Sequence, residues 1–262
     1  MGMDRNVIDA IHALEDEIKD HVAFKELREF GRLLVERPLD ARGLKTFFAT
    51  MRAFFDDIPT GILALALRVA DDWAGHDPYE ATAKGAYILF ADVDEFGLHE
   101  QHAGLLPTHH QLFRDLTQHL GVTTADLASR EYVLQSGIDL GERTTQYYRH
   151  RSVAEALGYH LASETTSQRE FVYFLKGFQA HQDHYGLTGD GDPVLDFFRV
   201  HTVVEPAHRS RGRELIEIYA ARDLSVMPEI RAGAIAFMDG FATLFRDLND
   251  AIYGTSYQRQ AI

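Results

Sequence analysis

Apolar residues recur every three or four positions along almost the whole chain, and no segment alternates between apolar and polar residues. The first spacing is typical of helices that turn one face towards a core, whereas alternation would be typical of strands. The first apolar stripe runs from Ile8 to Phe30 and ends at Pro38. The pattern therefore predicts an all-α protein.

Prolines, glycines and capping residues divide this pattern into helices and loops. The other expected helices span about residues 40–58, 60–73, 78–97, 108–120, 144–166, 167–184, 192–224 and 225–253. Loops are expected at 98–107, at 137–141 and in the glycine-rich segment 186–193. No repeat, low-complexity tract or long linker divides the chain. We therefore expect a single domain, residues 1–262, built as a bundle of seven to nine helices.

The composition supports a folded core and argues against several functions. Hydrophobic residues make up 45% of the 262 residues, and 17 Phe and 11 Tyr supply apolar surface to bury, so general disorder is excluded. The 26 Lys and Arg against 40 Asp and Glu give a net charge of −14, without a basic stripe, which argues against a nucleic-acid partner. The lack of cysteine excludes disulfides, thiolate metal sites and cysteine nucleophiles.

The sequence shows no targeting or membrane segment. Its first twenty residues form an acidic amphipathic stretch rather than a charged and then apolar signal peptide. The longest apolar run, 61–67, is too short to cross a bilayer. We therefore expect a cytoplasmic protein that acts on a small molecule, with no membrane partner.

Among 14 histidines, one pair has the spacing of metal ligands. His201, Glu205 and His208 stand at positions i, i+4 and i+7 of an expected helix, within roughly 60° of one another. Two imidazoles and a carboxylate on one face suit iron or manganese. A solvent-facing polar stripe is the alternative, but the motif is surrounded by Phe and Val residues. Pro206 lies inside the motif and is expected to kink the helix.

A buried metal pair would need about six ligands, and further carboxylates are available. Asp92, Asp94 and Glu95 end an otherwise apolar helix. Glu164 lies among small and apolar residues, where an acid is out of place unless it is paired. An exposed position near a helix end is the alternative for Glu164. Tyr159 and His160 come shortly before it and are candidates to line a pocket.

In this order, the motifs resemble those of the haem-oxygenase-like diiron oxidases and oxygenases, a superfamily that shares its helical fold with haem oxygenase and thiaminase II. The family pattern is a Glu, then a His before an L-F-type helix ending in Leu-Gly, then a Glu, and last His-x3-Asp/Glu-x2-His. The matching segments here are 94–96, 109–122, Glu164 and 197–208. The resemblance covers about residues 40–220, and its specificity lies in the combination of motifs.

The resemblance implies a haem-oxygenase-like bundle in which six residues hold two Fe(II) ions and use O2 as co-substrate. The implied catalytic ligands are Glu95, His109, Glu164, His201, Glu205 and His208. Glu205 replaces the more usual Asp. The 14-residue separation of Glu95 and His109 is long for the family and leaves His102 as a rival ligand, with His99 and His110 as further alternatives. A manganese–iron pair would accept the same ligands.

The resemblance further implies a non-haem diiron oxidase or oxygenase of secondary metabolism. We expect a small organic acid, amino-acid-like, as the substrate, modified by N-oxygenation, desaturation or C–C cleavage with electrons from an unidentified donor. The oligomeric state is left open, with a homodimer as one option. The alternative is a non-catalytic metal- or haem-binding protein of the same fold, for which His12 and His21 would be the haem ligands to consider.

Overall fold

The computed structural model describes residues 5–91, 93–98 and 105–254, without the side chains of residues 90, 91 and 205–207. The elements are α1 (Arg5–Asp20), α2 (Val22–Glu36), α3 (Ala41–Phe55), α4 (Ile58–Ala74), α5 (Ala81–Ala91), η1 (Val93–Phe96), α6 (His109–His119), α7 (Thr124–Leu127), α8 (Gln135–Arg149), α9 (Val153–Gln179), α10 (Gln182–Tyr185), η2 (Pro193–Leu195), α11 (Asp196–Arg222), η3 (Leu224–Val226) and α12 (Met227–Tyr253). The η elements are 3₁₀ turns. The described residues contain no strand, which confirms the all-α prediction.

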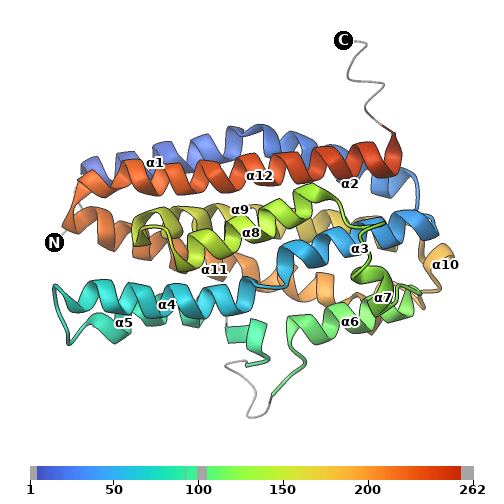
Figure 1. Cartoon of the computed structure of the whole chain (residues 1–262), viewed down its shortest axis with the longest axis horizontal. Coiled ribbons are helices and arrows are strands. Elements are labelled where there is room, and N and C mark those ends of the chain that lie inside the picture. The colour runs from blue at the N-terminus through green and yellow to red at the C-terminus, as the bar shows by residue number, and fades with distance from the viewer. Residues whose placement is uncertain (1–4, 92, 99–104, 255–262) are drawn as a thin grey trace, which may run out of the picture.

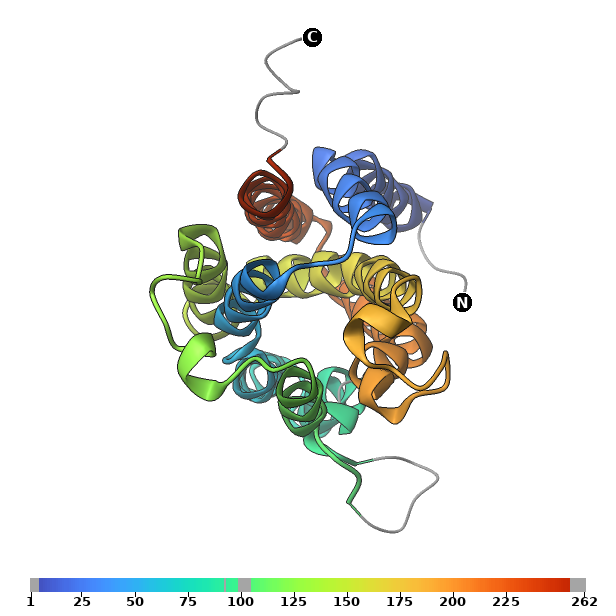
Figure 2. The same cartoon turned by 90° about the vertical axis from the view of Figure 1, so that its right-hand side faces the viewer.

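The long helices lie roughly along one direction (Figure 1). α1, α2 and α12 form one side of the bundle, α3, α8, α9 and α11 lie in the middle, and α4, α5 and α6 form the opposite side. Viewed along the bundle, α9 occupies the centre (Figure 2), and it packs against α2, α11 and α12. A residue of α9 can therefore face the core or α11 depending on its position along the turn.

Two glycines allow α9 and α12 to pack closely. A Cβ on Gly158 would lie 1.7 Å from the carbonyl oxygen of Ile230, and a Cβ on Gly233 would lie 1.9 Å from that of Glu155. Neither distance is possible for a real Cβ, so both positions require glycine. The backbones of α9 and α12 are thus in direct contact at these two positions, which fixes how closely α9 packs against α12.

The core is rich in aromatic rings contributed by helices that are far apart in sequence. Phe30 of α2 packs on Phe47 of α3 at 5.5 Å between ring centroids, and Phe47 packs edge-on against Phe174 of α9 at 5.0 Å. Phe245 of α12 completes this group, 5.6 Å from Phe30. These contacts join four helices around one buried cluster. No described helix is long and apolar enough to cross a membrane.

Several predicted boundaries differ from those observed. The expected loop 137–141 is wrong, since it lies inside α8. A Cβ on Gly137 or Gly141 would lie 2.7 Å and 2.2 Å from carbonyl oxygens of α3, so these glycines permit close packing rather than a loop. The expected break at 166/167 is also wrong, because α9 continues through it and begins only at Val153, capped by Ser152.

The structure also divides the bundle more finely than seven to nine helices. The first stripe is split into α1 and α2 at His21, whose Nδ1 accepts a hydrogen bond from the N–H of Ala23 and caps α2. The segments α7 and α10 are single turns of four residues. α11 continues as a helix through position 206, although proline removes a backbone hydrogen bond there.

Candidate functional site

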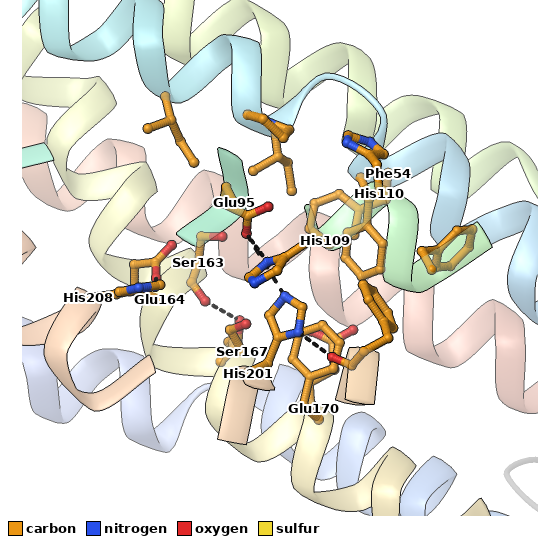
Figure 3. A pocket seen from close by; sticks show the side chains of 18 of the residues that line it. Phe54, Glu95, His109, His110, Ser163, Glu164, Ser167, Glu170, His201 and His208 are labelled. Atoms are coloured by element: carbon orange, nitrogen blue, oxygen red, sulfur yellow. Dashed lines mark hydrogen bonds and ion pairs between the residues drawn. The ribbon is translucent and has the colours of Figure 1, made fainter. Parts of the chain in front are cut away.

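Four segments bring acids and histidines together inside the bundle (Figure 3). The group consists of Asp94 and Glu95 in η1, His109 at the start of α6, Glu164 in α9, and His201 and His208 in α11. The two histidines of α11 are two helical turns apart and so share a face of that helix. α6 approaches from the side of the bundle formed by α4, α5 and α6.

A return of the chain explains how Glu95 and His109 meet despite their separation in sequence. The N–H of Leu106 donates a 2.8 Å hydrogen bond to the carbonyl of Gly97 and so joins the two ends of the intervening segment. Gly97 has φ of 73°, and a Cβ there would lie 2.2 Å from the Leu106 carbonyl oxygen, so glycine is required. Thr108 then caps α6, and its first residue, His109, lies beside Glu95.

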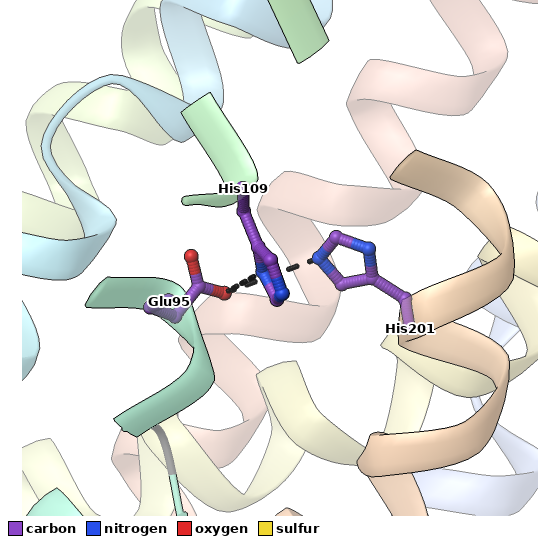
Figure 4. A group of neighbouring side chains, drawn as sticks. All are labelled: Glu95, His109 and His201. Carbon is purple, nitrogen blue, oxygen red and sulfur yellow. Dashed lines mark ion pairs between the residues drawn. The ribbon is translucent and has the colours of Figure 1, made fainter. Parts of the chain in front are cut away.

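Glu95, His109 and His201 form the tightest part of the group (Figure 4). Nδ1 of His109 lies 2.8 Å from Oε1 of Glu95, and Nε2 of His201 lies 3.9 Å from the same oxygen. One nitrogen or oxygen from each of the three residues lies within 4.8 Å of the others. The three residues are therefore candidates to hold one metal ion together.

His208 lies between two carboxylates. Its Nε2 is 3.0 Å from Oδ1 of Asp94, and its Nδ1 is 3.4 Å from Oε2 of Glu164. Asp94 also contacts one of the three residues described above, since its Oδ2 lies 3.1 Å from Nε2 of His109. Asp94 therefore connects the two parts of the group.

The three histidines are buried, with 4–5% of each residue exposed. Burial lowers the pKa of His201 well below its ordinary value, so this ring is neutral. Nδ1 of His201 lies 2.6 Å from the carbonyl oxygen of Phe197. In the neutral ring Nδ1 donates to that carbonyl, and Nε2 then has its lone pair directed towards Glu95. A metal-binding histidine is commonly held in this way.

His109 has the opposite electrostatic environment. Burial lowers its pKa, but the charges of Glu95 and Asp94 together outweigh burial and raise the pKa to about 10. Burial likewise raises the pKa of the Asp94 carboxyl, but His109 and His208 outweigh it and bring that pKa well below its usual range. Without a bound cation, a protonated imidazole thus balances the carboxylates.

A further layer of side chains holds these residues. The ring of Phe171 stacks on His201 with centroids 3.8 Å apart. His160, fully buried and one turn before Glu164, has its Nδ1 3.7 Å from Oε1 of that carboxylate. A 3.1 Å hydrogen bond joins the same Nδ1 to Oη of Tyr148. Glu164 is thus faced by imidazoles of two helices.

The group opens into a cavity of about 710 Å³, measured to include the space at its mouth. The apolar part of the wall is formed by Phe54, Phe55, Ile58, Ile62, Phe113, Phe171, Phe197 and Phe237. The polar part contains the residues of the group other than Asp94, together with Arg52, Asp56, His110 and four residues of α9, namely Ser163, Thr166, Ser167 and Glu170. This mixture of an apolar wall and a few polar groups is typical of a small-molecule site.

Five of the six residues expected to bind metal lie in this group. Glu205 is in α11, but its side chain lies outside the description, as do His99, His102 and Asp92. The choice between His109 and His102 is therefore not tested. His110 lines the cavity, and its Nε2 lies 4.0 Å from Oδ1 of Asp56.

Sequence reasoning missed two acids of the site. Asp94 was grouped with its neighbours but not selected as a ligand, since the sequence does not show which of several adjacent acids faces inward. Glu170 was not noticed. Its signal was available: Phe174 and Phe178, four and eight residues later, place it on an apolar face of its helix.

The model of a protein family described as an iron-containing redox enzyme matches residues 78–241, more than half of the chain. The chain belongs to this family. The matched range includes every acid and histidine of the group described above. Among curated proteins, none matches the sequence.

This iron-containing redox enzyme also resembles solved structures. Two crystal structures of a CADD-like protein of unknown function from Nostoc punctiforme PCC 73102 share 18% sequence identity with it. One has a TM-score of 0.67 and covers 95% of this chain and 99% of that one; the other has a TM-score of 0.62 and covers 97% and 98%. At this identity the likeness shows the fold, and with the family it confirms the haem-oxygenase-like bundle.

The donor atoms of the group fit the iron that the family implies. Both ring nitrogens of His109 and Oδ2 of Asp94 are buried and make no hydrogen bond of acceptable geometry within the described residues. Yet His109 lies within 2.8–3.1 Å of carboxylate oxygens on two sides. Buried polar atoms rarely lack such bonds, and a cation bound at one ring nitrogen would satisfy that nitrogen and leave the other to donate to a carboxylate. Imidazole and carboxylate are also ligands that iron accepts.

Proposed function

We propose that this protein is a non-haem diiron oxidase or oxygenase that uses O2 to modify a small, amino-acid-like organic acid. The observation that carries the proposal is the convergence of carboxylates and imidazoles from η1, α6, α9 and α11 in one buried group. Its two halves, one around His201 and one around His208, offer a place for each of two ions.

The residues divide between the two places as follows. Glu95, His109 and His201 would hold one ion, and Glu164 and His208 the other, with Glu205 as the ligand expected from the sequence. Asp94 reaches a histidine in each half and is suited to connect them. When bound, Fe(II) supplies the electrons and open coordination positions for O2 chemistry, which side chains alone lack.

The remaining side chains would orient the ligands and keep water out. The Phe197 carbonyl fixes which nitrogen of His201 carries the proton. Phe171 covers one face of that ring, and Phe113 and Phe197 close the wall beside it. A substrate in the cavity would place one end at the ligand group and its apolar part against these phenylalanines. The polar residues of α9 would contact its functional groups.

The test is the amount of iron bound per chain after anaerobic addition of Fe(II), followed by O2 uptake. The wild type should bind close to two irons and consume O2. A His201→Ala/His208→Ala double variant should lose most of both, whereas His12→Ala should retain both because His12 is exposed on α1. Equal iron content in the double variant and the wild type would overturn the proposal.

A further inference from the structure

Glu170 is a buried acid that the proposed metal site does not use. It lies in α9, six residues after Glu164, and is 2% exposed. Its Oε1 is buried without a hydrogen-bond partner within the part of the chain that the structure describes. Burial raises the pKa of this carboxyl well above its ordinary value and so favours its protonated form. A buried polar group in this state is unusual and calls for an explanation.

Among the described residues that line the cavity, no cationic side chain is available to pair with Glu170. It lines the same cavity as the metal-binding group (Figure 3). Of its two neighbours in sequence, Phe171 is stacked on His201, and the guanidinium of Arg169 lies over the ring of Phe24. Among the described lining residues the one arginine is Arg52, whose Nε is already 3.2 Å from Asp56. The buried histidines of the lining face other carboxylates. A cationic partner for Glu170 would therefore enter with a ligand.

The charge of the wall indicates what kind of ligand this is. Besides Glu170, the lining contains the carboxylates of Asp56, Glu95 and Glu164. A ligand carboxylate would meet these wall carboxylates, whereas a cation would favour the ionised form of Glu170. The opposite wall is formed by phenylalanine and isoleucine side chains. The cavity thus combines an isolated acid with an extended apolar surface.

We propose that Glu170 binds the ammonium group of an amine substrate whose apolar part packs against the phenylalanine wall. This assignment adds a substrate-binding residue to the proposed function. The reaction of the bound amine rests on that proposed function, whereas the binding of the amine does not. The amine of an amino-acid-like substrate would meet this requirement. Glu170 is assigned to binding and not to metal coordination.

The test compares ligand binding by calorimetry, with the protein as purified and after anaerobic iron loading. The probes are 2-phenylethylamine and n-hexylamine, with 3-phenylpropionate and hexanoate as acids of similar shape. The wild type should bind at least one amine more tightly than the matching acid. Glu170→Gln should weaken that amine by at least about tenfold, because the variant cannot ionise. Glu131→Gln, which changes an exposed carboxyl paired with Arg42, should bind like the wild type.

Iron content separates this inference from the proposed function. Glu170→Gln should bind as much iron as the wild type, and a clear loss would show that Glu170 is a metal ligand and overturn the assignment. Equal amine affinity in the wild type and the variant, or tighter binding of the acids, would overturn it too. If the wild type binds amine but no iron, the binding assignment stands and the diiron proposal fails. Circular dichroism of each variant verifies folding.

Discussion

Two buried glutamates on the same helix have opposite surroundings. Glu164 and Glu170 are six residues apart on α9, about 9 Å along its axis. Glu164 is faced by His160 of its own helix and by His208 of α11. Glu170 has a buried oxygen without a hydrogen-bond partner and is accompanied by Phe171.

The difference follows from position along the turn. His160 stands four residues before Glu164 and so lies on the same face. Glu170 shares its face with Phe174, four residues later, and Phe178, eight residues later, and that face meets the aromatic core. A carboxylate among imidazoles is suited to hold a metal ion. A carboxyl group isolated among aromatic rings is unfavourable in the empty protein and is best explained by a ligand that pairs with it.

The largest expected effect is on iron binding. Glu164→Gln removes a charged ligand while keeping the shape of the side chain, so the affinity for Fe(II) should fall by at least about tenfold. Glu170→Gln is the matched control, with the same chemical change on the same helix and no expected loss. Anaerobic titration with Fe(II), followed by metal analysis, measures both. Equal losses in the two variants would remove the distinction between the two acids.

The stability of the metal-free protein should change in opposite directions. Glu170→Leu replaces an unpaired buried acid by an apolar side chain of similar size, so the free energy of unfolding should rise by about 1–3 kcal/mol. Glu164→Leu should lower it, since His160 and His208 then face no carboxylate at this position. Urea unfolding at pH 7 measures both values. Destabilisation by Glu170→Leu would mean that this carboxyl has a partner in the folded protein.

Much of the fold could be predicted because helical periodicity is a local property. The stripe pattern located α3, α4, α6 and α12 to within a few residues of their observed positions. Errors arose at glycines, because glycine occurs both in loops and where two helices pack closely. Gly137 and Gly141 suggested a loop, but their lack of a side chain serves contact between α8 and α3, which depends on a distant part of the chain. The start of α9 had a local signal, Ser152 followed by Glu155, which was overlooked.

The parts of the site that lie close together in the sequence were easier to predict than those that distant segments bring together. His201 and His208 lie on one helix, so their common face follows from spacing alone. Glu95 and His109 meet only because Gly97 and Leu106 close the segment between them, which composition does not reveal. The role of Glu170 depends on which helices supply the rest of the cavity wall. That information is tertiary and is absent from any single segment.

The last expected effect is a difference in pH dependence between the wild type and Glu170→Gln. The Glu170 carboxyl has a raised pKa in the folded protein, so the unfolded chain binds fewer protons at pH values above the ordinary carboxyl range near 4.5. The wild type should therefore lose stability relative to Glu170→Gln as pH rises from about 5 to 8, by no more than about 1.4 kcal/mol per pH unit. All other titrating groups are shared and cancel in the comparison. Urea unfolding of metal-free protein across this range measures the difference.

Parallel stability curves would show that Glu170 is ionised in the fold, as a paired acid would be. Adding saturating 2-phenylethylamine to the wild type should reduce the slope, since the bound ammonium favours the ionised carboxylate.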